Sequence, residues 1–157
     1  MGSQVVIFAL GREEYGMPIE VVREITRLGV VRPIPQAPSY VKGLINIRGA
    51  AIPLIDLHVR FGVPGGKGWE DQIQAGEVQE ENSFALITEV NGSLIGFAVD
   101  QVREVRVLDN IVPPPPLVTA PFIAGIENLQ DRIIMFLAPE KILENDELQG
   151  LNQIAAN

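Results

Sequence analysis

The chain repeats one sequence pattern about eighty positions apart. Gly16 lies four residues before Glu20, and Gly96 lies four residues before Asp100, 80 positions later. Residues 22–25 read Val-Arg-Glu-Ile and match residues 102–105, Val-Arg-Glu-Val, at the same offset without a gap. This period is longer than the roughly 20–50 residues of a solenoid unit. It predicts two copies of a small all-β unit within one body.

Composition limits the classes of protein that fit. The chain has 157 residues, of which 46% are hydrophobic, so it can bury a core as one domain or as two small units. Its formal net charge of −8 argues against nucleic acid as a partner. It has no cysteine, no basic and apolar leader, and no apolar run long enough to cross a bilayer. We expect a cytoplasmic protein that does not insert into a membrane.

Local patterns predict mostly strands. Alternating and apolar runs joined by turn residues predict two hairpins, over residues 5–18 and 84–99, and further strands at 43–47, 51–57 and 133–137. Asn91-Gly92 and Arg48-Gly49 are the expected tight turns. The apolar spacing of residues 19–25 predicts a short helix, and that of residues 139–148 predicts another near the carboxyl end.

The fold expected from these elements is mainly β. We predict two five-stranded β-barrels, pseudo-repeated within a single domain over residues 4–148, with short helices and a C-terminal helix. The first copy covers about residues 4–61 and the second about 84–148. Residues 62–83 form a glycine- and glutamate-rich loop that contains Trp69, and residues 149–157 form a tail. Whether strands pass between the barrels stays open at this level.

A search for catalytic groups finds none. His58 is the only histidine, and with no cysteine it cannot build a metal site alone. We expect it at the exposed end of a strand. Residues 65–68, Gly-Gly-Lys-Gly, lack the hydroxyl residue and the flanking strand and helix of a phosphate loop. The sequence therefore predicts no catalytic residue, no metal and no cofactor.

The two copies differ at positions that packing alone does not fix. Arg48 is matched by Gln130 in the second copy, and Asp56 is matched by Ala138. The arginine fork suits a partner's carboxylates or carbonyls. An internal Arg48–Asp56 ion pair that fixes the hairpin is the alternative, and both stay open here.

Several segments together resemble the CheW family, the coupling proteins of bacterial chemotaxis. They are residues 14–16, 19–25, 38–49, 52–57 and 96–102, the last with the pattern Gly-x-x-Val-Asp-x-Val. The resemblance covers about residues 4–148, and its length favours a free-standing member rather than the related domains of longer chains. It implies two intertwined five-stranded barrels. It also implies a non-catalytic adaptor that binds chemoreceptor tips and the regulatory domain of the histidine kinase CheA, at membrane-bound receptor arrays.

Carried over position by position, the resemblance assigns two contact sets. The residues expected to touch receptors are Val22, Glu24, Gly43, Arg48, Gly49 and Val105. Those expected to touch CheA are Gly96, Ile111 and Val112. An apolar groove with charges at its rim suits the helical hairpin of a receptor tip. Two other classes remain open on the residues alone: a peptide-binding or assembly module outside chemotaxis, and a small-ligand barrel or enzyme.

Overall fold

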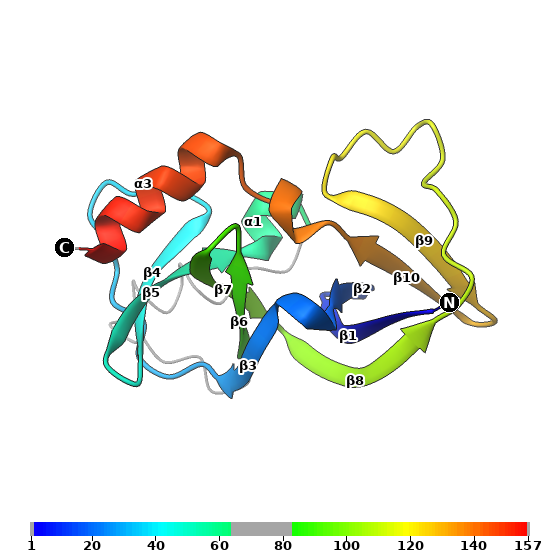
Figure 1. Ribbon diagram of the computed structural model, residues 1–157, viewed down its shortest axis with the longest axis horizontal. Coiled ribbons are helices and arrows are strands. Elements are labelled where there is room, and N and C mark those ends of the chain that lie inside the picture. Colours follow the sequence, from blue (N-terminus) through cyan, green and yellow to red (C-terminus); the bar gives the residue numbers. More distant parts are fainter. Residues whose placement is uncertain (1, 64–82, 157) are drawn as a thin grey trace.

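Two five-stranded sheets organise the computed structural model, which describes residues 2–63 and 83–156. Sheet A has the order β8-β1-β2-β10-β9, with strands β1 Ser3–Leu10, β2 Glu13–Pro18, β8 Gln101–Leu108, β9 Ile123–Leu129 and β10 Arg132–Leu137. Sheet B has the order β3-β6-β7-β5-β4, with β3 Val22–Arg27, β4 Val41–Ile47, β5 Ala50–Asp56, β6 Phe84–Val90 and β7 Ser93–Val99. The sheets lie side by side in Figure 1. Most of the predicted 62–83 loop, including Trp69, falls outside the described residues.

The two copies of the repeat exchange their hairpins. Hairpin β1–β2 of the first copy pairs with β8 and β10 of the second copy. Hairpin β6–β7 of the second copy pairs in turn with β3 and β5 of the first. Each sheet therefore holds two strands of one copy and three of the other. Neither copy supplies a complete sheet.

The repeated glycines lie where the two copies meet. Gly16 on β2 stands opposite Phe136, and Gly96 on β7 stands opposite Leu54, both across parallel pairs. A Cβ at Gly16 would lie 3.2 Å from a Val5 methyl group, and a Cβ at Gly96 would lie 3.2 Å from a Leu54 methyl group. These contacts are tighter than ordinary packing, so the repeated glycines fit the close junction of the exchanged strands.

The strand pairing forms two five-stranded sheets, and it does not close them into the barrels predicted from the sequence. In sheet A the outer strands are β8 and β9, and in sheet B they are β3 and β4. The described residues reach across each opening by one isolated bridge, Val112 to Ile126 in sheet A and Arg32 to Leu44 in sheet B. The segment at Val112 follows β8 and bridges to β9, and the segment at Arg32 follows β3 and bridges to β4. Each sheet is therefore curled, but its two outer strands are not paired with each other.

The predicted helix at residues 19–25 is wrong. Residues Ile19–Val21 form a single 3₁₀ turn, η1, and the chain then continues as strand β3. Along β3, half-buried and exposed positions alternate, which is the period of a strand. β-branched Val22 and Ile25 favour the extended backbone, and pairing with β6 satisfies it. The few apolar positions matched a helical spacing by coincidence.

The helices are short except at the carboxyl end. Helix α1 covers Leu57–Phe61, the 3₁₀ turn η2 covers Pro139–Lys141, and α3 covers Asn145–Ala156. A helix is thus confirmed near the end, but it begins later than predicted and extends through the segment expected to be a tail. Helix α3 lies over β5 of sheet B (Figure 1). Apolar Leu148 and Leu151 are buried, which explains the extension.

The main core joins the two sheets. It includes Phe8 from sheet A and Phe97 from sheet B, both fully buried. An aromatic series connects Phe8, Tyr15, Phe61 and Phe122, with ring centroids 5.7, 5.3 and 4.3 Å apart. Each sheet also has a smaller core of its own. Because the largest core is shared, the sheets are packed against each other as one body.

Candidate partner-binding surface

The turn between β4 and β5 presents Arg48 to solvent. Arg48 and Gly49 both have positive φ, 53° and 86°, as a two-residue hairpin turn of type I′ requires. The Gly49 N–H donates to the side-chain oxygen of Asn46 at 3.0 Å, which fixes the turn. The Arg48 side chain is 81% exposed. The tight turn predicted from the sequence is confirmed, and it holds the arginine at the end of sheet B.

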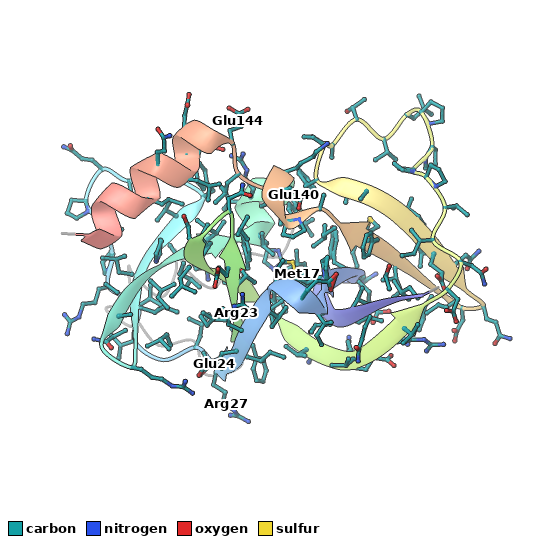
Figure 2. The ribbon with its side chains drawn as sticks, viewed as in Figure 1. Met17, Arg23, Glu24, Arg27, Glu140 and Glu144 are labelled. Atoms are coloured by element: carbon teal, nitrogen blue, oxygen red, sulfur yellow. The ribbon has the colours of Figure 1, made fainter. Side chains whose placement is uncertain are left out.

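Glu24, and not Asp56, is the ionic neighbour of Arg48. A guanidinium nitrogen of Arg48 lies 3.5 Å from the carboxylate of Glu24 on β3. Figure 2 shows Arg23, Glu24 and Arg27 in that order along β3, with Arg27 at the lower margin of the molecule. Because Arg48 itself is largely exposed, this long ion pair with the half-buried Glu24 adds little to stability, and the Arg48 fork remains able to bind another carboxylate or carbonyl.

The alternative Arg48–Asp56 pair is wrong because Asp56 is a helix cap. Asp56 is buried, and its side chain accepts from the backbone N–H groups of His58 and Val59 at 3.0 and 3.4 Å. These are the first free donors of α1. In the second copy Ala138 provides no cap, and only the 3₁₀ turn η2 follows. Capping of α1 therefore explains why the first copy has Asp56 where the second copy has Ala138.

The equivalent region of sheet A is locked by an ionic cluster. Arg132 donates two hydrogen bonds to Glu14 at 2.9 and 2.8 Å and one to Glu104 at 2.7 Å. Hydrogen bonding to Arg132 lowers the pKa of Glu14 despite its partial burial. The repeat places Ala50 at the position of Arg132 and Leu94 at that of Glu14. Sheet B therefore lacks an equivalent ionic cluster. Its charged residue at this end, Arg48, is exposed to solvent.

The remaining receptor-set residues differ in accessibility. Val22 on β3 is half-buried and packs against the shared core. Val105 is 49% exposed and lies on β8, an outer strand of sheet A. Gly43 is buried with φ +151°, and a Cβ there would collide with the Arg32 carbonyl oxygen. Glu24 and the Arg48 turn are brought together on sheet B, whereas Val105 stands on the other sheet.

The kinase set does not form one surface. Gly96 is buried within β7 of sheet B, surrounded by Leu54, Ile87 and Ile45 side chains. Ile111 and Val112 cross β9 of sheet A. Ile111 is half-buried and packs on the sheet A core, while Val112 is 55% exposed. Of the three, Val112 presents the most accessible side chain.

A histidine–aspartate contact joins α1 to the junction between β7 of sheet B and β8 of sheet A. His58 is buried in α1, which corrects the expectation of an exposed strand-end residue. Its Nε2 lies 2.9 Å from Asp100, and its Nδ1 lies 3.3 Å from the Val63 carbonyl oxygen. Asp100 also accepts from the Gly11 N–H at 2.6 Å. The hydrogen bond with Asp100 raises the pKa of His58. Sequence reasoning missed this contact, although Asp100 belongs to the repeated motif.

Two classes of site are not found in the described part of the chain. Residues 2–63 and 83–156 contain no group of three or more histidine, cysteine or acidic side chains arranged to hold a metal ion. The same residues include no helix with the length and apolar character of a bilayer span. What the described surface offers is a charged turn beside the outer strand β3, on which Ile25 is exposed. Exposed turns and strand edges of this kind are common at protein-contact surfaces.

Such an arrangement defines a β-rich scaffold built for contact with other proteins. The CheW-like domain family matches residues 4–147, so the chain belongs to this family. A chemotaxis protein CheW of Klebsiella aerogenes is 30% identical over 99% of this chain and 90% of its own length, and one of Treponema pallidum is 34% identical over 94% and 86%. The crystal structure of the scaffolding protein TtCheW from Thermoanaerobacter tengcongensis is 34% identical, with a TM-score of 0.78 over 94% of this chain and 96% of that one.

Family membership gives the biochemical class. The chain is a chemotaxis coupling protein of the scaffold type, and the family is not catalytic. The two five-stranded sheets agree with the fold of the scaffold structure. The resemblance seen in residues 14–102 of the sequence is confirmed by these matches.

Proposed function

We propose that this chain is a cytoplasmic adaptor that binds the cytoplasmic tips of chemoreceptors and the regulatory domain of the histidine kinase CheA. In this function it stands at membrane-bound receptor arrays and holds the two partners in a fixed relation. The shared core between the sheets supports this role, because coupling requires that the two contact regions move as one body. Modest contacts suffice, since an array raises the effective concentration of each partner.

The exposed Arg48 carries the receptor half of the proposal. It is fixed on a tight turn, its position in the second copy is held by Gln130, and it lies 3.5 Å from Glu24. Arg48 and Glu24 would form the charged rim of the receptor contact, with Gly49 holding the turn and with Val22 and Val105 as the apolar part. Gly43 would contribute indirectly, because it lets the Arg32 backbone pass over β4.

Val112 carries the kinase half. Its side chain is exposed at the edge of sheet A, and Ile111 beside it is anchored in the core. Gly96 would act through the packing of sheet B rather than by touching CheA. An exposed apolar residue on an ordered segment suits a hydrophobic contact with a domain of the same fold.

Charge reversal and charge insertion test the two halves separately. We expect Arg48→Glu to weaken binding to soluble receptor tips by about tenfold or more, since opposing like charges at a contact cost several kcal/mol. Val112→Asp should instead lower affinity for the CheA regulatory domain. Titration calorimetry with each purified partner measures both effects, and thermal melting reports on the fold.

Arg12→Glu is the matched control, because Arg12 lies exposed in the β1–β2 turn of the other sheet. It makes the same change in net charge and should leave both affinities unaltered. Equal receptor affinity for wild type and Arg48→Glu, or absence of any binding to CheA by the wild type, would contradict the proposed function. In that case a peptide-binding module outside chemotaxis becomes the better reading.

A further inference from the structure

Residues 110–112, the strap, are fastened across the outer strand β9 at two neighbouring positions. Val112 and Ile126 exchange both backbone hydrogen bonds, at 2.9 and 2.8 Å. The Asn110 N–H donates to the carboxylate of Glu127 at 2.7 Å. Gly125 has no side chain, and a Cβ there would collide with Ile111. The strap therefore lies close on β9 with an attachment on either side of Ile111.

The first copy of the repeat has the same crossing without the charged attachment. Arg32 and Leu44 exchange backbone hydrogen bonds at 2.9 and 2.8 Å, as Val112 and Ile126 do. The position equivalent to Glu127 is Ile45, which is buried in the sheet B core. The repeated frame thus accommodates an apolar side chain at this site, and packing does not require a carboxylate.

Glu127 is nonetheless buried, with only 5% of its surface exposed. A buried carboxylate is unfavourable unless hydrogen bonds compensate it. A bond from a backbone N–H to an ionised acceptor is among the stronger hydrogen bonds in proteins. The short bond from Asn110 is therefore an attachment specific to the second copy, where the most exposed residue of the proposed kinase contact lies two positions farther along.

We propose that Glu127 is a positioning residue that orders the strap for kinase binding. It holds the Asn110 backbone, so that Val112 is presented in one conformation before the partner arrives. Binding to an ordered segment avoids the entropy cost of fixing it on association. This inference rests on the proposed function, because it takes the strap as the contact with the CheA regulatory domain.

Substitutions at Glu127 test the inference. Glu127→Ile installs the residue type of the first copy, so a folded protein is expected, but it leaves the Asn110 N–H without its acceptor. We expect faster hydrogen exchange at the Asn110 amide and a CheA affinity about five- to tenfold lower, from the cost of ordering the strap on binding. Glu127→Gln keeps an accepting oxygen and should restore affinity to within about twofold.

A second pair of variants removes the donor instead. Asn110→Pro eliminates the N–H and should lower CheA affinity as Glu127→Ile does, while Asn110→Ala keeps the N–H and should behave as wild type. Affinity for receptor tips should be unchanged in all four variants, because none of the proposed receptor residues lies in the strap or contacts Glu127 through a hydrogen bond. A merely structural role would lower both affinities together.

The outcomes separate this inference from the proposed function. Faster Asn110 exchange with full CheA affinity in Glu127→Ile would overturn the positioning role alone. Unchanged exchange would overturn the attachment itself. A wild type that fails to bind CheA would reject the proposed kinase contact, and this inference with it.

Discussion

The structural role of a single residue can be predicted from the sequence when that role depends on neighbouring residues in the chain. The Asn91-Gly92 and Arg48-Gly49 turns follow from the need for positive φ at both positions, and both are confirmed. His58 is the opposite case, because its partner Asp100 is 42 positions away and comes from the junction of β7 and β8. Nothing near His58 in the sequence indicates that contact. Both ring nitrogens face oxygen acceptors, so only the doubly protonated ring donates to both.

The His58–Asp100 contact predicts a pH-dependent stability. Because the folded-state pKa of His58 is raised above 6.5, its contribution is fully present below about pH 6.5 and is lost as pH rises through the raised value. We expect the loss to be below about 1 kcal/mol, since Asp100 is 41% exposed and water screens the pair. Urea unfolding at a series of pH values measures it.

His58→Gln provides the control for that measurement. Glutamine does not titrate, so the pH dependence between about pH 6 and 9 should flatten in this variant. Burial alone works to raise the pKa of Asp100, but its bonds from His58 and the Gly11 N–H leave the pKa below its ordinary value. An unaltered pH profile in His58→Gln would show that another group produces the dependence.

At the scale of elements, hairpins are predicted well and helix boundaries poorly. A short run such as residues 19–25 fits helical and extended spacing equally, and pairing with β6 decides between them. The start of α3 depends on Glu144 and Glu147. The Glu144 N–H donates to the Glu147 carboxylate at 2.7 Å, as at the beginning of a capped helix. Arg60 then joins α1 to α3, a contact between segments more than eighty positions apart.

The Arg60 contact predicts how firmly α3 is held. Arg60 makes two hydrogen bonds to Glu147, at 2.9 and 2.7 Å, and one to the Ile142 carbonyl oxygen at 2.8 Å. It also lies over the Tyr40 ring, with 4.8 Å to the centroid. Lysine cannot reproduce this fork. We expect Arg60→Lys to lower the free energy of unfolding by about 1–3 kcal/mol and to speed hydrogen exchange in α3.

Lys141→Ala is the control variant for Arg60→Lys, because Lys141 is exposed at the end of η2. It alters a neighbouring charge without touching the fork and should stay within about 0.5 kcal/mol of wild type. Burial, followed by the hydrogen bond with Glu147, raises the pKa of Tyr40 to about 12. Equal α3 exchange in wild type and Arg60→Lys would mean that apolar packing of Leu148 and Leu151 alone holds the helix.

At the scale of the whole molecule, the repeat predicts the strands but not their partners. The two copies are visible in the sequence, yet the exchange of hairpins is a long-range choice that local pattern does not encode. The same limit applies to the candidate surface. Arg48 and Glu24 were each selected from the sequence, but their contact was not. Gly96 and Val112 were assigned to one face, and they lie on different sheets.

The exchange predicts that neither copy folds alone. A fragment of residues 1–63 lacks β6 and β7, and a fragment of residues 83–157 lacks β1 and β2. We expect each to be largely unfolded, and the mixture to form a 1:1 complex with the circular dichroism of the intact chain. Size-exclusion chromatography measures the complex. Independent folding of either fragment as a monomer would contradict the exchanged topology.

The exchange also explains how one small chain can carry two unlike faces. Two identical polypeptides that swapped these hairpins would form a symmetric dimer, and each surface would occur twice. Joining them in one polypeptide lets each half change on its own. At equivalent positions of the two copies, Arg48 corresponds to Gln130 and Glu127 corresponds to Ile45. The broken symmetry gives the molecule a direction, with one end distinguishable from the other, which no symmetric dimer of the same halves possesses.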